Sequence, residues 1–235
     1  MKPLFVLLAL VVGAYSFADE IDLPEEELAR ETTLPVFNKQ RAVLNRNVIT
    51  EKRFELGVGG GLELNEPYYN DIMFTAQATY NYSDVSAINV QGLMWMDGLS
   101  TYGEQLKKGE RHRAFDATKA PHPTWGVLAN YQFIAYYGKI SITKTGVMNL
   151  NLFGLAGLGY INMEEANSVA LNLGVGQNFF FTKSVGLRAD MRMLIFQGPD
   201  ATSQDLHPSL NPSASAFDDR IYYNTQLSLS LVYIL

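Results

Sequence analysis

The sequence predicts an all-β protein, an eight-stranded antiparallel up-and-down transmembrane β-barrel with a short amino-terminal periplasmic segment. Three observations lead to this fold class. From residue 53 onward, bulky apolar residues alternate with polar or small ones at the period of a strand that has one apolar face. The polar positions are mostly Gly, Ala, Ser, Asn and Gln, which a narrow interior can hold. After residue 18, no stretch approaches the roughly 18 consecutive apolar residues of a membrane helix.

Residues 1–18 predict a secretory signal peptide. A lysine at position 2 precedes an apolar run over 4–12, and Ser-Phe-Ala at 16–18 is a small-residue cleavage site. The alternative is a membrane anchor, but the apolar run is short for one. The chain carries a net charge of −6 and no cysteine. We therefore expect no nucleic-acid partner, no disulfide, no metal and no cofactor.

Residues 19–52 predict a periplasmic segment in front of the barrel. Pro24 and the glutamates at 25–27 indicate the start of a short helix, because proline fits a first turn and carboxylates favour its dipole. The more basic stretch 39–52 has two interpretations. It is either a partly disordered linker, or a segment that docks on a partner or on the barrel mouth.

The barrel itself spans residues 53–235, and each expected strand shows its own alternation. The first four are 53–64 (leucines against glycines), 71–82 (aromatic residues against Thr, Gln and Asn), 86–96 (Ile, Val and Met against Asn and Gln) and 124–137 (aromatic residues and Val against Asn and Gln). The last four are 146–160 (leucines against Asn and Gly), 168–181 (Val and Leu against Asn and Gly), 184–196 (Leu and Met against Arg and Asp) and 220–235 (leucines against Gln and Ser).

The connections form two sets. Those at 81–84, 137–146 and 182–184 are compact, whereas those at 65–70, 97–123, 162–167 and 198–218 form the other set and include two long loops. Short turns at one end and longer loops at the other are typical of an outer-membrane barrel, with the short turns and both termini in the periplasm.

A secreted barrel with its apolar face inward is the competing interpretation. Eight strands enclose too little space for the roughly forty bulky side chains of that face, so we expect the face to contact lipid. Amphipathic rings near strand ends then predict an aromatic girdle at the membrane boundary, formed by Tyr80, Tyr82, Trp95, Trp125, Tyr137, Tyr160, Tyr222 and Tyr223.

Six charged residues fall on the polar face and predict a charge network in the lumen: Arg53, Glu55, Glu63, Arg188, Asp190 and Arg192. In a narrow lumen these groups would pair, because an unpaired buried charge is costly. The network is interpreted either as a structural plug or as a gate for ions or small solutes. The inward glycines at 57, 59 and 61 are expected to make room for large neighbours.

No catalytic residue is expected. His112, His122 and His207 lie in the predicted loops, where Asp116 and nearby serines could complete an acid–base group, but nothing in the sequence fixes that geometry. Basic residues at 107, 108, 111 and 113 are interpreted as a solvated loop or as a contact to lipid phosphates.

The closing strand carries a predicted assembly signal. Its alternate residues, Leu227, Leu229, Leu231, Tyr233 and Leu235, resemble the carboxyl-terminal signal that outer-membrane assembly machinery reads, although that signal usually ends in an aromatic residue. We expect this strand to pair with the first and close the barrel, because an open edge cannot face lipid.

The block over 32–57, with Leu-Pro-Val-Phe at 34–37, Asn-Arg-Asn-Val at 45–48 and Arg-x-Glu-Leu-Gly at 53–57, resembles outer-membrane β-barrel domain proteins of predatory and gliding deltaproteobacteria. Tyr-Gly-Lys at 137–139 is also similar. The resemblance implies a small barrel in the outer membrane and no enzyme, and it favours docking for residues 32–52.

The expected function is structural: a plugged barrel that organises the envelope by self-association or by docking partners. Small residues on the lipid face, Ala76, Ala78, Gly92, Ala129 and Ala156, motivate the self-association. The first alternative is a narrow channel for small or hydrophobic solutes, and the second is a lipid-modifying enzyme. The expected partners are outer-membrane lipids, the assembly machinery and further copies of the chain.

Overall fold

A computed structural model describes residues 48–70, 72–96, 98–109, 114–141, 147–163, 166–204, 206–207, 212–213 and 216–235. The chain divides into two units at Arg41/Ala42, and all described residues belong to the second unit, Ala42–Leu235. The predicted signal peptide and nearly all of the predicted periplasmic segment lie outside the described residues.

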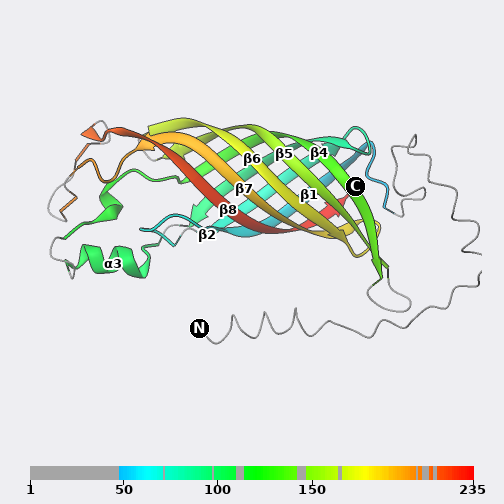
Figure 1. Ribbon diagram of the computed structural model, residues 1–235, viewed down its shortest axis with the longest axis horizontal. Coiled ribbons are helices and arrows are strands. Elements are labelled where there is room, and N and C mark those ends of the chain that lie inside the picture. The colour runs from blue at the N-terminus through cyan, green and yellow to red at the C-terminus, as the bar shows by residue number, and fades with distance from the viewer. Residues whose placement is uncertain are drawn as a thin grey trace, which may run out of the picture. The chain divides into compact units, whose positions relative to one another are not determined.

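The second unit is a closed barrel of eight strands in the order β1-β2-β3-β4-β5-β6-β7-β8 (Figure 1). Each strand pairs antiparallel with the next, and β8 pairs antiparallel with β1. The strands are β1 (Arg53–Glu63), β2 (Ile72–Asn81), β3 (Ser86–Met96), β4 (Trp125–Ser141), β5 (Val147–Met163), β6 (Ala166–Phe180), β7 (Val185–Pro199) and β8 (Asp219–Ile234). The predicted eight-stranded antiparallel barrel is confirmed, including the pairing of the last strand with the first.

Three connections are shorter than the sequence indicated. β4 continues to Ser141 and β5 begins at Val147, so half of the predicted connection over 137–146 is strand. β5 also extends to Met163, which pairs with Ala166 in β6, and β7 extends to Pro199. The alternation in β4 is broken by a bulge between Ile134 and Tyr136, which makes the strand look as if it ends early.

Side chains alternate between the interior and the outer surface along every strand. In β8, Leu229 is 53% exposed and Leu231 is 56% exposed, whereas the intervening Ser230 is 1% exposed. The exposed positions carry large apolar side chains on all eight strands, so the outer surface is apolar all round. The predicted sidedness of the bulky face is therefore confirmed.

Glycine at inward positions lets neighbouring strands approach closely. A Cβ on Gly157 would collide with the backbone oxygen of Ala129 and would lie 2.5 Å from Asn130 Oδ1. A Cβ on Gly59 would collide in the same way with Leu229 and Ser230. These two positions need glycine for space, but the neighbour at Gly59 is the β8 backbone with the small Ser230, and no large side chain fills that space.

The long connections gather at one end of the barrel, here called the loop end, and the opposite end is called the turn end. Helix α3 (Thr101–Lys107) lies at the loop end (Figure 1) and is capped by Ser100, whose hydroxyl accepts a hydrogen bond from Gly103 N at 3.0 Å. The 3-10 helix η1 (Ala117–Lys119) is joined to α3 by an ion pair between Lys107 Nζ and Asp116 Oδ2 at 3.1 Å. Among the described residues, none of the helices is long and apolar enough to cross a membrane.

Candidate functional site: the filled lumen and the loop-end pocket

A buried ion cluster occupies the middle of the lumen. Arg188, Asp190 and Arg192 follow one another at every second position of β7 and therefore share its inward face. Asp190 accepts hydrogen bonds from Arg188 Nε at 3.2 Å and from Arg192 Nε at 2.6 Å. Within the described residues, the Nη nitrogens of both arginines have no hydrogen-bond partner. The Asp190 carboxylate is the centre of the cluster, because it contacts both arginines.

Two further residues complete this layer. The Arg188 guanidinium carbon lies 4.0 Å from the centroid of the Phe153 ring, a cation–π contact. Glu55 is buried on β1, accepts a hydrogen bond from Asn81 Nδ2 at 2.7 Å, and lies within electrostatic reach of Arg188. The cluster thus combines two buried cations with two buried carboxylates, and these four belong to the predicted network.

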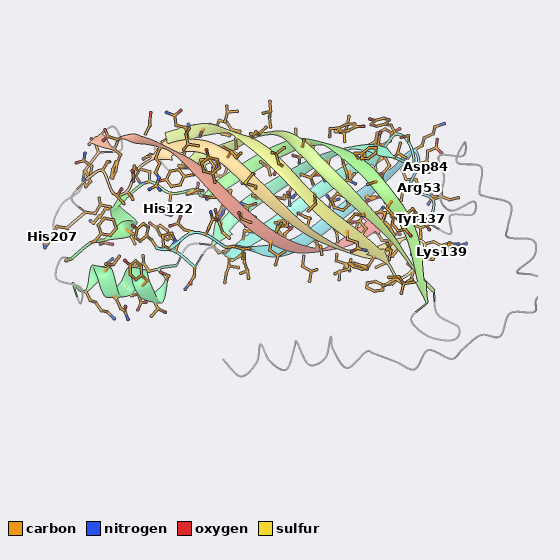
Figure 2. All side chains as sticks on the ribbon, viewed as in Figure 1. Arg53, Asp84, His122, Tyr137, Lys139 and His207 are labelled. Carbon is orange, nitrogen blue, oxygen red and sulfur yellow. The ribbon has the colours of Figure 1, made fainter. Side chains whose placement is uncertain are left out.

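The other two predicted charges lie elsewhere. Glu63 is partly buried near the loop end of β1, where it accepts a hydrogen bond from Trp95 Nε1 at 2.9 Å. Arg53 is exposed at the turn end, next to the tight turn at Lys52, whose φ is 57° (Figure 2). The prediction that Arg53 belongs to the lumen network is wrong, because the first residue of β1 lies at the rim.

Amide side chains form a second polar group beside the ion cluster. Asn172 Nδ2 donates to Asn130 Oδ1, and Asn130 Nδ2 donates to Asn89 Oδ1 at 3.2 Å. Asn89 Nδ2 in turn donates to Thr79 Oγ1 at 2.8 Å. This chain of bonds follows the inner wall from β6 to β2, because its members lie at the same level on neighbouring strands and Asn172 and Asn130 flank the side-chain-free Gly157.

An apolar layer closes the lumen toward the loop end. Nine inward-facing side chains form it: Met73, Leu93, Trp95, Leu128, Ile161, Met163, Ala170, Leu194 and Phe196. This layer was not predicted, because the inward face was expected to be polar. The sequence does contain a pattern that indicates this layer, since β2, β3, β4 and β7 each carry apolar residues on both faces near the loop end.

A smaller apolar seal lies at the turn end. Val48, just before β1, is buried against Phe180 of β6 and Ile234 of β8. Val48 N donates to Tyr137 Oη at 3.5 Å, and Tyr137 Oη donates to Asn149 Oδ1 at 3.0 Å. The lumen is therefore filled in three successive layers: the turn-end seal, the polar layer and the loop-end apolar layer.

The residues of the predicted aromatic girdle fall into two groups. Five of its rings are exposed on the outer surface: Tyr80, Tyr82, Trp125, Tyr160 and Tyr223. Trp95, Tyr137 and Tyr222 instead point inward.

Strand geometry accounts for all three exceptions. Trp95 lies between the outward-facing Met94 and Met96, and Tyr222 precedes the outward-facing Tyr223. In β4 the bulge turns Tyr136 outward, and Tyr137 therefore points inward.

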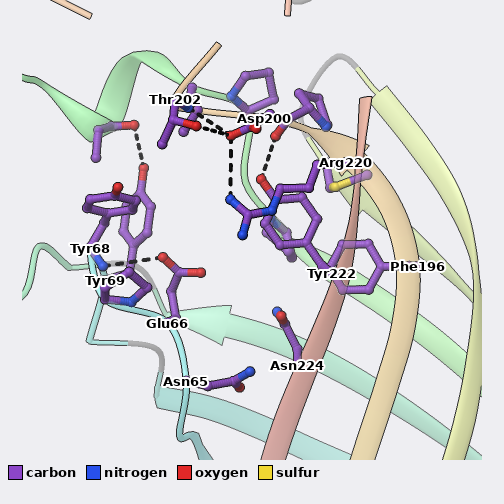
Figure 3. Close-up of a pocket in the computed structure, with 18 of the residues that line it drawn as sticks. Asn65, Glu66, Tyr68, Tyr69, Phe196, Asp200, Thr202, Arg220, Tyr222 and Asn224 are labelled. Atoms are coloured by element: carbon purple, nitrogen blue, oxygen red, sulfur yellow. Dashed lines mark hydrogen bonds and ion pairs between the residues drawn. The ribbon is translucent and has the colours of Figure 1, made fainter. Parts of the chain in front are cut away.

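The loop end contains a cavity of about 470 Å³ (Figure 3). Its walls come mainly from the connections after β1, β3 and β7 and from the start of β8. Tyr68, Tyr69, Phe196 and Tyr222 supply aromatic surface, and Met163 and Phe196 also belong to the apolar layer below. The cavity is therefore closed toward the lumen. The sequence analysis did not predict it, because three separate loops form it.

Three charged groups line this cavity. Glu66 Oε1 accepts a hydrogen bond from Tyr68 N at 3.3 Å. Burial raises the pKa of Glu66 above the usual glutamate value, although the Tyr68 amide, His122 and Arg220 oppose the rise. Arg220 Nη1 lies 3.8 Å from Asp200 Oδ1, and its guanidinium carbon lies 5.8 Å from the centroid of the Tyr222 ring.

The described members of the possible acid–base group, His122, His207 and Asp116, all lie in the loop-end connections, and Asp116 N donates to Leu206 O, next to His207. His122 stacks on Tyr69 with ring centroids 4.8 Å apart, and Figure 2 shows His207 at a separate point of the loop end. Asp116 contacts Lys107 and the Thr118 hydroxyl. Burial opposes ionisation of Asp116, but these contacts outweigh it and hold its pKa below the usual range. His112 lies outside the described residues, and within those residues no three His, Asp or Glu side chains form a metal site.

The residues of the predicted assembly signal share one face of the closing strand. Leu227, Leu229, Leu231, Tyr233 and Leu235 are all exposed on the outer surface. The intervening Ser228, Ser230, Val232 and Ile234 are buried. Their recognition by assembly machinery stays a prediction.

The fold and its interior define a class of molecule: a closed eight-stranded antiparallel barrel with a side-chain-filled lumen and an apolar outer surface. Among solved structures, the chain is similar to Neisserial surface protein A, with a TM-score of 0.33 and 11% identity over 78% of this chain and 94% of that one. No family model and no curated protein matches the sequence. The barrel assignment follows from the strand pairing alone, and the resemblance of residues 32–57 to the deltaproteobacterial family stays a prediction.

Proposed function

We propose that the chain is a structural barrel of the bacterial outer membrane, which acts through its surfaces and does not conduct through its lumen. The filled lumen carries this proposal. The turn-end seal, the polar layer and the loop-end apolar layer bury side chains at three successive levels of the barrel. The apolar outer surface supports a place in lipid, since soluble monomers rarely expose contiguous apolar surface this extensive.

Conductance measurements test the closed lumen. The purified, folded barrel should give no reproducible single-channel steps in planar bilayers, because side chains replace the water column of a conducting pore. A large porin inserted in the same bilayers serves as the positive control. Discrete steps of constant size from the folded protein would instead support the channel alternative.

Self-association is the way in which this barrel would organise the envelope. A groove of about 630 Å³ crosses the outer surface of β1, β2, β3 and β8, and Ala76, Ala78 and Gly92 are among its lining residues. Leu231 and Tyr233 also line it and are exposed. Small side chains let membrane-embedded partners approach closely, and a two-fold pair would place the large residues of one copy against the groove of the other. This groove supports a second copy of the chain as the partner.

A bulky substitution in the groove should abolish the pair. We expect Ala76→Phe to reduce the cross-linked dimer in native membranes to background, because the added ring fills the space that the partner needs. Leu158→Phe is the matched control, since Leu158 is 61% exposed on β5 and does not line the groove. Equal dimer yields from the two variants, or monomer alone from the unaltered chain, would argue against self-association through this face.

A further inference from the structure

The loop-end pocket has the form of a small-molecule site. Its volume of about 470 Å³ lies within the roughly 300–1,000 Å³ usual for such sites. The Tyr69 hydroxyl donates to Ala117 O and the Tyr222 hydroxyl donates to Pro199 O, both at 2.7 Å. These bonds fix the two side chains to the backbone of the loop-end connections. The aromatic walls are thereby held in place before any ligand enters.

The charges of the pocket favour a cation. Arg220 Nη1 lies 3.8 Å from Asp200 Oδ1 and its guanidinium lies beside the Tyr222 ring, so Asp200 offsets part of its charge. Glu66 Oε1 accepts the hydrogen bond from Tyr68 N, and Glu66 lies within electrostatic reach of His122 and Arg220. Figure 3 shows its carboxylate directed into the space between the walls. Two carboxylates and one guanidinium leave the described part of the lining net negative.

The aromatic rings favour the same charge. Tyr68, Tyr69 and Tyr222 line the space that the Glu66 carboxylate faces. Cations are attracted to the faces of aromatic rings within about 6 Å, most strongly where water is excluded. An ammonium group could therefore contact the carboxylate and the rings together, while its apolar part rests on Phe196 and Met163.

We infer that the loop-end pocket is a binding site for a small organic cation, an amine or quaternary ammonium carried on an apolar or aromatic body. The site is independent of the proposed structural role, because it lies above the apolar layer and its occupation needs no passage through the lumen. Burial of Glu66 supports the inference, since a cation bound beside a partly buried carboxylate would offset the loss of solvation.

Two probes of the same shape and opposite charge test the inference. The full barrel in nanodiscs is titrated calorimetrically at pH 7.5 with phenethylammonium and, separately, with phenylacetate. Saturable one-to-one binding of phenethylammonium is expected, with phenylacetate weaker by at least about ten-fold, because a charge-assisted contact is worth this much or more. Comparable affinities for the two probes, or no saturable binding of phenethylammonium, would overturn the inference.

Variants then locate the site. Glu66→Gln should weaken phenethylammonium binding by about ten-fold or more, because it removes the carboxylate charge and keeps the shape. Arg220→Ala should strengthen binding, because it removes the positive charge and releases Asp200. The matched control is Glu104→Gln on α3, an exposed carboxylate that lies 3.8 Å from Lys108 Nζ and outside the pocket. Unchanged affinity in Glu66→Gln, or an equal loss in Glu104→Gln, would contradict the assignment. Each variant is first checked for the folded mobility of the barrel on unheated gels.

Discussion

Replacing Asp190 with alanine is expected to lower the free energy of unfolding of the barrel by about 3–5 kcal/mol, the loss typical of breaking a buried ion pair. Asp190 accepts hydrogen bonds from both Arg188 and Arg192, and its side chain is fully buried. Without the carboxylate, two guanidinium groups would remain in the lumen with one buried acid, Glu55, nearby. Urea titration of the barrel in phospholipid vesicles, followed by gel mobility, measures the change.

Asp219→Ala provides the comparison for Asp190. It removes the same side chain from the neighbouring strand, at an exposed position where Asp219 Oδ2 accepts a hydrogen bond from Gln197 Nε2 at 2.9 Å. Its effect should stay below about 1 kcal/mol, because water replaces the lost partner. An Asp190→Ala barrel as stable as the Asp219→Ala barrel would mean that the ion cluster does not hold the lumen together.

The second large effect is expected at Gly157. An alanine there should destabilise the barrel by about 1–3 kcal/mol, the usual cost of overpacking a filled interior. The new Cβ would meet the backbone of Ala129 and the amide of Asn130, and β4 could move away only by breaking its pairing with β5. The same urea titration reports the loss.

Gly154→Ala is the matched control for Gly157. Gly154 lies three positions earlier on the same strand but faces outward, where the nearest atom to an added Cβ is Gly174 O at 4.0 Å. Alanine should be neutral or slightly stabilising there, since glycine in a strand carries an entropic cost. Equal destabilisation by both substitutions would show that β5 is sensitive to any side chain, whichever face it occupies.

Most of the fold could be predicted from the sequence, because strand alternation is a local signal. A two-residue period identifies each strand and the face that carries its bulky side chains, without knowledge of the neighbouring strands. Because the interior of a narrow barrel cannot hold those side chains, the bulky face must point outward. The bulge at Ile134/Tyr136 could not be predicted in this way. It depends on how β4 pairs with β5, and it reverses the sidedness of every residue that follows in β4.

The interior was predicted less completely than the fold. Arg188, Asp190 and Arg192 could be placed because they occur at every second position of one strand. The apolar layer was missed because Met73, Leu128 and Leu194 are apolar residues on inward faces that are otherwise mostly polar, and each was considered only within its own strand. Only the closed barrel brings these exceptions to the same level. The loop-end pocket has no local signal at all, since its walls come from separate connections.

The turn-end seal has a consequence for the order in which the barrel forms. Seven of the strand pairings join consecutive segments and can arise as hairpins, whereas the β1–β8 pairing joins the two ends of the barrel and requires the longest loop closure. Val48 touches Phe180 of β6 and Ile234 of β8, and these two residues come within its reach only when β8 lies beside β1. Val48 therefore stabilises the β1–β8 pairing. We expect its contacts with Phe180 and Ile234 to form after the barrel has closed, and β1 and β8 can separate at this end only after those contacts are broken.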